Sequence, residues 1–219
     1  MGPEWIGDDL SAWSGEGRSC TDAGGTSGSR NRETICSLLR RAAPGDWVVF
    51  PRGALTGYFP GERDYLADTG RENVEAALER LRAVVARQGC HCLVGTARFV
   101  VDEWRNSAVL LSPGGEVRRY DKNVLNPFDS RHFVASDELC VWEVDGVKVG
   151  VQICWELLFP QPWAQLKRDG AQIVFHLNNA VKPKDAFCSG ARLKTATSSP
   201  APTTPRPPDA ALVSDRSLG

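Results

Sequence analysis

The sequence lacks the features that mark membrane, secreted or nucleic-acid-binding proteins. No apolar run approaches the roughly 18 residues of a membrane-spanning helix. The first residues, M-G-P-E-W-I-G-D-D, have neither the basic nor the apolar region of a secretory signal. The formal net charge is −1, so the charge balance favours neither nucleic acid nor a membrane surface. These absences predict a cytoplasmic protein whose partners are small molecules.

Cysteine is present, but without the pattern of a disulfide-rich protein. The seven cysteines are an odd number at irregular spacings, which favours reduced thiols. Cys90-His91-Cys92 has one residue between its thiols and no second pair downstream, which is a poor spacing for zinc. We therefore predict no metal site, and we expect Cys92 to begin a buried strand.

The central part of the chain alternates helical and strand patterns. With 219 residues and 42% hydrophobic content, the chain fits one globular domain with a sizeable core. Apolar periodicity predicts helix-then-strand pairs at 35–42 with 46–50, 72–88 with 92–100, and 162–169 with 171–177. Two hairpins are expected around turn sequences, 106–111 with 116–120 and 139–144 with 147–153. Crossover connections combined with hairpins predict an α/β fold of two packed mixed sheets covered by helices.

Three junctions between a strand and a loop carry reactive or charged side chains. The run V-G-V-Q-I-C-W-E-L-L-F-P places Cys154 at the end of an apolar strand. Lys122 lies in the polar break of R-R-Y-D-K-N-V-L-N-P-F, and Arg52 follows the apolar run in V-V-F-P-R-G-A-L-T-G-Y. A cysteine beside an apolar strand is usually a small buried side chain, so the other two junctions are what single out Cys154.

Together these junctions resemble the nitrilase superfamily of carbon-nitrogen hydrolases, over roughly Asn31 to Lys182. The resemblance implies an α-β-β-α sandwich with its site at strand ends. It implies Cys154 as nucleophile, and Lys122 with the backbone N–H of Trp155 as stabilisers of developing negative charge. It further implies a small amide, nitrile or carbamoyl substrate, no metal or organic cofactor, and assembly into dimers or larger homo-oligomers.

One position departs from the family at the catalytic centre. Members carry a general-base glutamate directly after this Phe-Pro, whereas Phe50-Pro51 is followed here by Arg52. A free thiol with a pKa near ~8.5 is only slightly ionised at neutral pH. Lys122 and Arg52 can favour the thiolate, but neither can accept its proton. Loss of a general base commonly costs about 10²- to 10⁴-fold in rate.

Other residues could complete or replace this chemistry. Glu156 and Glu62 are alternative bases, although each also fits a solvated or salt-bridged acid. The candidate pocket residues, which could equally be core or turn residues, are Tyr58, Glu156, Phe159, Asn178 and Asn179. Three functions stay open: a cysteine hydrolase of carbon-nitrogen bonds, a catalytically inactive relative of that fold, and a cysteine-histidine hydrolase that uses His176 or His132.

The two ends differ in composition from the domain expected at residues 31–184. Residues 1–30 are rich in Gly, Ser and charge, and residues 185–219 are rich in Pro, Thr and Ala, so both segments are expected to be disordered. The family-like pattern stops sharply at both ends. This predicts an incomplete sandwich, from a shortened or frame-disrupted member, with exposed strand edges that favour association.

Overall fold

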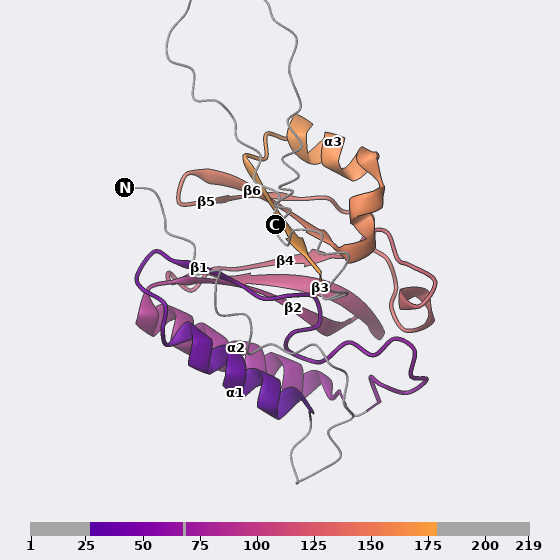
Figure 1. The fold of residues 1–219 in the computed structure, drawn as a ribbon, viewed down its shortest axis with the longest axis horizontal. Coiled ribbons are helices and arrows are strands. Elements are labelled where there is room, and N and C mark those ends of the chain that lie inside the picture. Colours follow the sequence, from indigo (N-terminus) through magenta and orange to yellow (C-terminus); the bar gives the residue numbers. More distant parts are fainter. Residues whose placement is uncertain (1–26, 68, 179–219) are drawn as a thin grey trace, which may run out of the picture.

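The computed structural model of the chain describes residues 27–67 and 69–178. Two sheets lie face to face between helices (Figure 1). The first sheet has the order β1-β2-β3-β4, formed by Trp47–Val49, His91–Val100, Glu103–Leu111 and Val117–Asp121. The second has the order β5-β6-β7, formed by Val141–Val144, Val147–Ile153 and Ile173–Leu177. Each sheet combines one parallel pair with antiparallel pairing, which confirms the predicted mixed sheets.

The helices form the two outer layers. On the outer face of the first sheet lie α1 (Ser27–Leu39) and α2 (Arg71–Gln88) (Figure 1). The second sheet is covered by α3 (Pro160–Arg168), whose Leu166 packs 3.0 Å from the position that a Cβ would take on Gly150. The α-β-β-α sandwich is therefore confirmed. Within the described ranges, no helix combines the length and apolar character that crossing a membrane requires.

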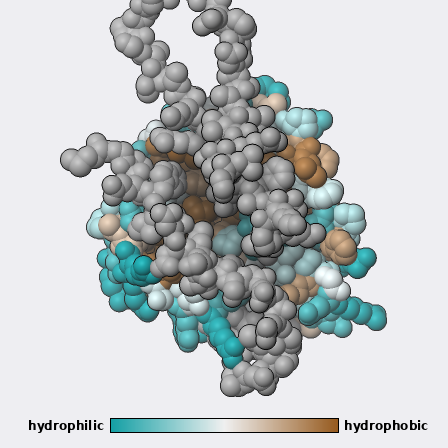
Figure 2. Space-filling view, viewed as in Figure 1, coloured by the Kyte–Doolittle hydropathy of each residue, from teal (hydrophilic) through white to brown (hydrophobic). Residues whose placement is uncertain are grey.

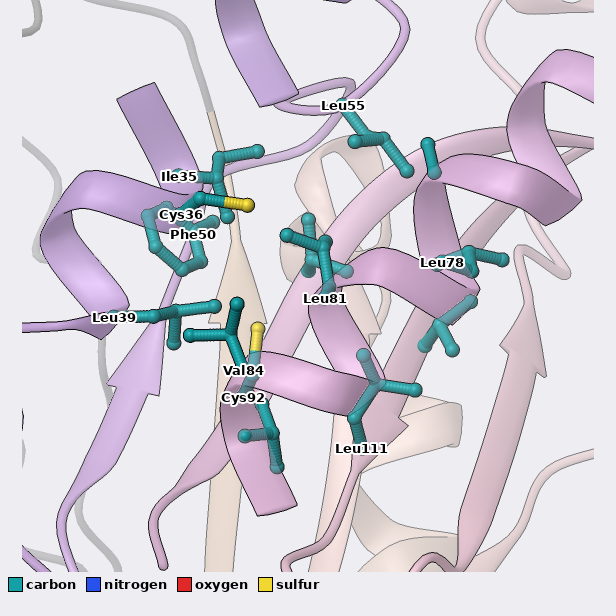
Figure 3. Packing of buried hydrophobic residues seen from close by; sticks show 14 of the residues in the cluster. Ile35, Cys36, Leu39, Phe50, Leu55, Leu78, Leu81, Val84, Cys92 and Leu111 are labelled. Carbon is teal, nitrogen blue, oxygen red and sulfur yellow. The ribbon is translucent and has the colours of Figure 1, made fainter. Parts of the chain in front are cut away.

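Strand alternation divides the apolar residues of the first sheet between two cores. Cys92 and Leu111 point toward the helices and pack with residues such as Ile35 and Leu81 (Figure 3). Leu93 points the other way, into the core between the sheets. Figure 2 shows hydrophobic atoms between the sheets and hydrophilic atoms over the helix layer of α1 and α2. The strand ends of both sheets are therefore anchored by closely packed hydrophobic cores.

The same alternation separates the side chains of Cys90-His91-Cys92 onto opposite sides of the first sheet. The thiols of Cys90, just before β2, and of Cys92 are fully buried in the core beneath α1 and α2, and burial raises the pKa of each. His91 faces the other sheet, where its Nε2 lies 2.8 Å from Asp145 and its ring stacks on Trp47. The five cysteines of the described part, Cys92 among them, carry free thiols.

Several element boundaries differ from the prediction. The first helix begins at Ser27 rather than near residue 35, so it includes residues 27–30 of the segment expected to be disordered. The third helix begins at Pro160 rather than 162, since proline is well suited to the first helical turn. The turn between β2 and β3 was not foreseen, because Val101 and Asp102 adopt positive φ angles of 46° and 63° without the usual glycine.

Candidate active site

Cys154 lies at a sharp turn between β6 and the short 3-10 helix η3 (Cys154–Leu158). Ile153 is fully buried and still extended, with φ −122°, whereas Cys154 has φ +51°. A positive φ is uncommon for a residue with a Cβ, and such strained residues cluster at functional sites. The turn leaves the Cys154 side chain half-buried at the strand end.

The Glu156 side chain stabilises the turn at Cys154 through hydrogen bonds. The side chain is fully buried, and Oε2 accepts a 2.6 Å hydrogen bond from the amide of Ile153. Oε1 accepts bonds from the hydroxyl of Tyr120 at 2.8 Å and from the amides of Asn123 and Val124 at 2.7 and 3.2 Å. Burial raises the pKa of Glu156, and these hydrogen bonds partly oppose the rise. The carboxylate therefore ties the Cys154 turn to the loop that carries Lys122.

Lys122 directly follows β4 and is held at both its backbone and its side chain. Its amide donates to the carbonyl of Asn106 at 2.9 Å, and its own carbonyl accepts from Ser136 at 3.0 Å. The ammonium pairs with Asp129, and both side chains are fully buried. A buried cation with one close carboxylate partner and a fixed backbone is strongly pre-organised.

Asp129 is a site residue that the sequence analysis missed. It begins the short helix η2 (Asp129–Arg131) and accepts a 2.5 Å hydrogen bond from the hydroxyl of Tyr58 in addition to the Lys122 contact. Asn126 accepts bonds from the amides of Phe128 and Asp129, each at 2.8 Å. The sequence Asn126-Pro127 indicates a turn that keeps the following residues close to Lys122. Asp129, two residues after this proline, could therefore have been recognised as a candidate partner of Lys122.

Arg52 lies in the loop after β1 and is almost fully buried. Its guanidinium carbon sits 3.6 Å above the centre of the Tyr58 ring, a cation–π arrangement. Burial raises the pKa of the Tyr58 hydroxyl, and the charge of Arg52 partly offsets this rise. Arg52, Tyr58, Asp129 and Lys122 thus form a continuous chain of contacts that joins two of the three junctions.

The backbone of the Arg52 loop is set by close packing on β2. A Cβ on Gly95 would come within 2.5 Å of the Arg52 Cα and of the Pro51 carbonyl oxygen. Gly53 has φ +67°, a conformation that favours glycine. The amide of Leu55 donates to the Gly95 carbonyl at 3.1 Å, which completes the turn.

The two histidines considered as bases bond to backbone oxygens. Nε2–H of His176 donates to the carbonyl of Cys154 at 2.9 Å, and His132 Nε2 lies 3.2 Å from the carbonyl of Pro60. Burial lowers the pKa of His176, and the charges of Arg52 and Lys122 lower it further. These cations therefore act on the same region as the Cys154 turn, and His176 serves as a support for that turn.

The remaining predicted residues lie at different places. Trp155 is 40% exposed in the first turn of η3, and Phe159 joins η3 to α3 and donates to the Glu156 carbonyl at 3.1 Å. Asn178 follows β7 and is half-buried, whereas Asn179 lies outside the described residues. Glu62 is exposed and lines a shallow hollow of about 190 Å³ that Arg131 and His132 share.

Comparisons with known proteins agree with this architecture. The sequence profile of the family described as carbon-nitrogen hydrolase matches residues 28–211, which continues past the predicted domain end at 184. A glutamine-dependent NAD(+) synthetase from Xylella fastidiosa is 34% identical over 156 residues, which cover 67% of this chain and 28% of that protein. An (R)-stereoselective amidase from Pseudomonas is 28% identical over 68% of this chain and 54% of that protein. The chain thus spans about half or less of these relatives.

Solved structures give the same fold. A variant of an amidase from Nesterenkonia AN1, of the nitrilase superfamily, superposes with a TM-score of 0.63 at 22% identity. The match covers 71% of this chain and 61% of that one. Further structures of this amidase, in variants with a glutamate replaced by glutamine or leucine, show acrylamide or the acetamide moiety of fluoroacetamide bound covalently to the active-site cysteine.

Proposed function

Because the chain belongs to the carbon-nitrogen hydrolase family, we propose that it attacks a small non-peptide amide or nitrile with Cys154. In the first step the sulfur bonds to the substrate carbon. For an amide, the carbon–nitrogen bond then breaks, and the nitrogen takes up the proton that the thiol has lost and leaves as ammonia. The product of this half-reaction is a thioester on Cys154, which water must hydrolyse to release the acid. A nitrile instead gives a thioimidate, from which water releases ammonia.

The observation that carries this proposal is the set of hydrogen bonds to the Glu156 carboxylate, which we call the Glu156 clamp. One buried carboxylate holds both the strained Cys154 turn, through Ile153, and the Lys122 loop, through Asn123 and Val124. A nucleophile and a cation set at fixed positions are what covalent catalysis requires. A merely structural cysteine needs neither a positive φ nor a buried carboxylate that links its turn to the loop of Lys122.

Charge stabilisation follows from the same arrangement. Attack on the carbonyl carbon develops negative charge on the substrate oxygen or nitrogen, and pre-organised donors in a water-poor site stabilise it best. We assign this role to the Lys122 ammonium and the Trp155 amide. The amide lies in the first turn of η3, where a helix leaves its N–H groups for outside acceptors. Asp129 is a positioning residue, since it holds the Lys122 ammonium and the Tyr58 hydroxyl together.

Arg52 limits the second half of this reaction. An arginine side chain stays protonated in proteins, so it cannot remove a proton from water or from the thiol. We expect acylation of Cys154 to be faster than hydrolysis of the thioester, so the acyl-enzyme accumulates. The amidase variants support only the nucleophilic part of this proposal, because their cysteine is alkylated by acrylamide or fluoroacetamide after a glutamate is replaced.

A second candidate is a catalytically inactive protein that retains the fold. Arg52 favours this second candidate, because it stands where the family resemblance implies a general base. The two proposals differ in what Cys154 does with a simple amide: an impaired hydrolase forms a thioester and releases ammonia, whereas an inactive relative binds the amide reversibly and releases no ammonia.

Intact-mass spectrometry with fluoroacetamide tests the proposal directly. We expect one acetamide adduct on the native full-length chain, formed as the thiolate displaces fluoride and located on Cys154 by peptide mapping. Slow ammonia release from simple amides is the second readout, and it separates an impaired hydrolase from an inactive relative. Cys154→Ala abolishes both, whereas Cys140→Ala, which removes another half-buried thiol, leaves both unchanged. Labelling rates of all seven cysteines against pH provide internal controls. Equal labelling of Cys154 and the other cysteines, or none at Cys154, would contradict the proposal.

A further inference from the structure

A groove runs along the outer layer of the molecule, between α1 and α2, on the side of the first sheet that faces away from the second. It encloses about 330 Å³. Four arginines line it: Arg32 in α1, Arg40 directly after that helix, and Arg80 and Arg87 in α2. We refer to it as the arginine groove. None of these side chains contributes to the contacts of Cys154, Lys122 or Arg52 described above.

The floor of the arginine groove is rigid and apolar. Cys36 and Val84 are 8% and 7% exposed, and both belong to the core that α1 and α2 form with the first sheet (Figure 3). Cys36 lies midway between Arg32 and Arg40, four residues from each, so these side chains follow one side of the helix. The two helices therefore hold the arginines along the rims of a fixed, apolar trough.

Helix periodicity separates the charges of α2. Arg80 and Arg87 are seven residues apart, which places them on one face of the helix. The acidic residues Glu72, Glu75 and Glu79 recur at spacings of three and four on the neighbouring face, where Glu79 pairs with Arg82 at 3.3 Å. Positive charge is thereby concentrated on the side of α2 that faces α1, although the chain as a whole has a net charge of −1.

The groove arginines have no acidic partner in the part of the chain that the structure describes. The ion pairs found across residues 27–67 and 69–178 involve other cations, and Glu33 is the one acid that lines the groove. Four guanidinium groups facing one trough repel one another, which a multivalent anion would relieve.

We propose that the arginine groove binds a small anion that carries two or more phosphoryl groups. Guanidinium groups match phosphate oxygens in bidentate fashion, and Arg–phosphate pairs are among the stronger hydrogen-bonded ion pairs. At about 1.5 Å of rise per helical residue, the arginines of each helix lie about 10–12 Å apart along its axis, which a single phosphate cannot span but an extended oligophosphate can.

Size favours a small molecule over a protein partner. Ligand pockets typically measure about 300–1,000 Å³, so the volume of about 330 Å³ lies at the lower end of that range. Cys36 and Val84 supply an apolar surface for the uncharged part of such a ligand. The two rims supply the charge, so the phosphoryl groups are expected to lie along the helices.

Isothermal titration calorimetry of the full-length chain with inorganic tripolyphosphate tests this inference. We expect saturable binding at one site that weakens as ionic strength rises. Arg80→Gln with Arg87→Gln weakens binding at least about tenfold, since two charge-assisted contacts are lost. Arg32→Gln with Arg40→Gln has a similar effect. Melting curves establish that each variant remains folded.

The matched control is Arg82→Gln, which removes an arginine from α2 outside the groove and leaves binding within about twofold of the unmodified chain. Sulfate is a single compact anion that cannot span the groove. At the same ionic strength we expect it to bind far more weakly than tripolyphosphate. Three results would overturn the inference: no saturable heat, equal affinity in the groove variants, or an equal loss in Arg82→Gln.

Discussion

The loops after β6 and β1 both place a candidate site residue at the end of a buried strand, but different forces hold them. A side chain fixes the first loop, because the Glu156 carboxylate accepts four hydrogen bonds beneath the Cys154 turn. Backbone packing fixes the second: the turn at Arg52 lies against Gly95, and Gly53 supplies a positive φ. The Arg52 side chain contributes a ring contact to Tyr58.

This difference separates the support of the site from its chemistry. The geometry at Cys154 depends on one particular carboxylate, so a change at Glu156 should damage the fold. The backbone at residue 52 is positioned by close packing against Gly95 and by the positive φ of Gly53. These backbone contacts do not depend on which side chain residue 52 carries, so we expect the turn to tolerate a substitution there.

The largest effect should come from restoring a base at position 52. We expect Arg52→Glu to raise the rate of ammonia release from small amides by about 10²- to 10⁴-fold, the range that a general base contributes. Arg52→Gln, which removes the cation without adding a base, should leave the rate low. Steady-state ammonia assays compare the two, and equal rates would show that position 52 does not carry the base.

Glu156→Gln tests the other loop. A glutamine has one acceptor oxygen and places an NH₂ group against a backbone donor, so buried N–H groups lose their partner. We expect a loss of about 3 kcal/mol in the free energy of unfolding by urea. Glu143→Gln, on the exposed side of β5, should change stability by less than about 0.5 kcal/mol. Similar losses in both variants would refute the clamp.

Gly95→Ala tests whether backbone packing positions Arg52. The new Cβ would meet backbone atoms at 2.5 Å, so the Arg52 turn must shift, at a cost of about 1–3 kcal/mol. The control is Gly150→Ala, whose Cβ would meet flexible Leu166 methyl groups at 3.0 and 3.2 Å and should cost less. Urea unfolding ranks the two variants, and the reverse order would contradict this reading of the loop.

The smallest expected effect is a pH dependence from His176. Its pKa is lowered by burial and by the nearby cations, so the folded state binds a proton less readily than the unfolded chain. Its contribution to stability is complete above the unfolded pKa of about 6.5 and is lost as the pH falls toward the folded value. His176→Gln keeps a donor for the Cys154 carbonyl but cannot titrate.

Urea unfolding between about pH 5 and pH 8 measures this dependence. The fall in stability below pH 6.5 should be shallower in His176→Gln than in the unmodified chain. His132→Gln is the comparison that leaves His176 in place. Identical pH slopes in the unmodified chain and His176→Gln would rule out this contribution of the imidazole.

The apolar core residues and the two hairpins could be predicted from the spacing of apolar residues and from turn sequences. Helical spacing located α2, and alternating apolar residues with turn sequences located β3 to β6. The turn at Val101-Asp102 escaped notice, because its residues carry no turn signal and the long antiparallel pairing of β2 with β3 imposes their positive φ. The residues expected at Cys154, Lys122 and Arg52 do lie at strand ends linked by contacts, although their catalytic roles stay predictions.

By itself, the sequence determined the periodic elements, the mixed α/β architecture and the absence of a glutamate after Phe50-Pro51, since each is a property of neighbouring residues. Only the tertiary structure decided what Glu156 and Asp129 do. Their partners Tyr120 and Tyr58 are 36 and 71 residues away in the chain, so spacing along the sequence could not pair them. The arginine groove has the same origin, because α1 and α2 become neighbours only by packing on the same sheet.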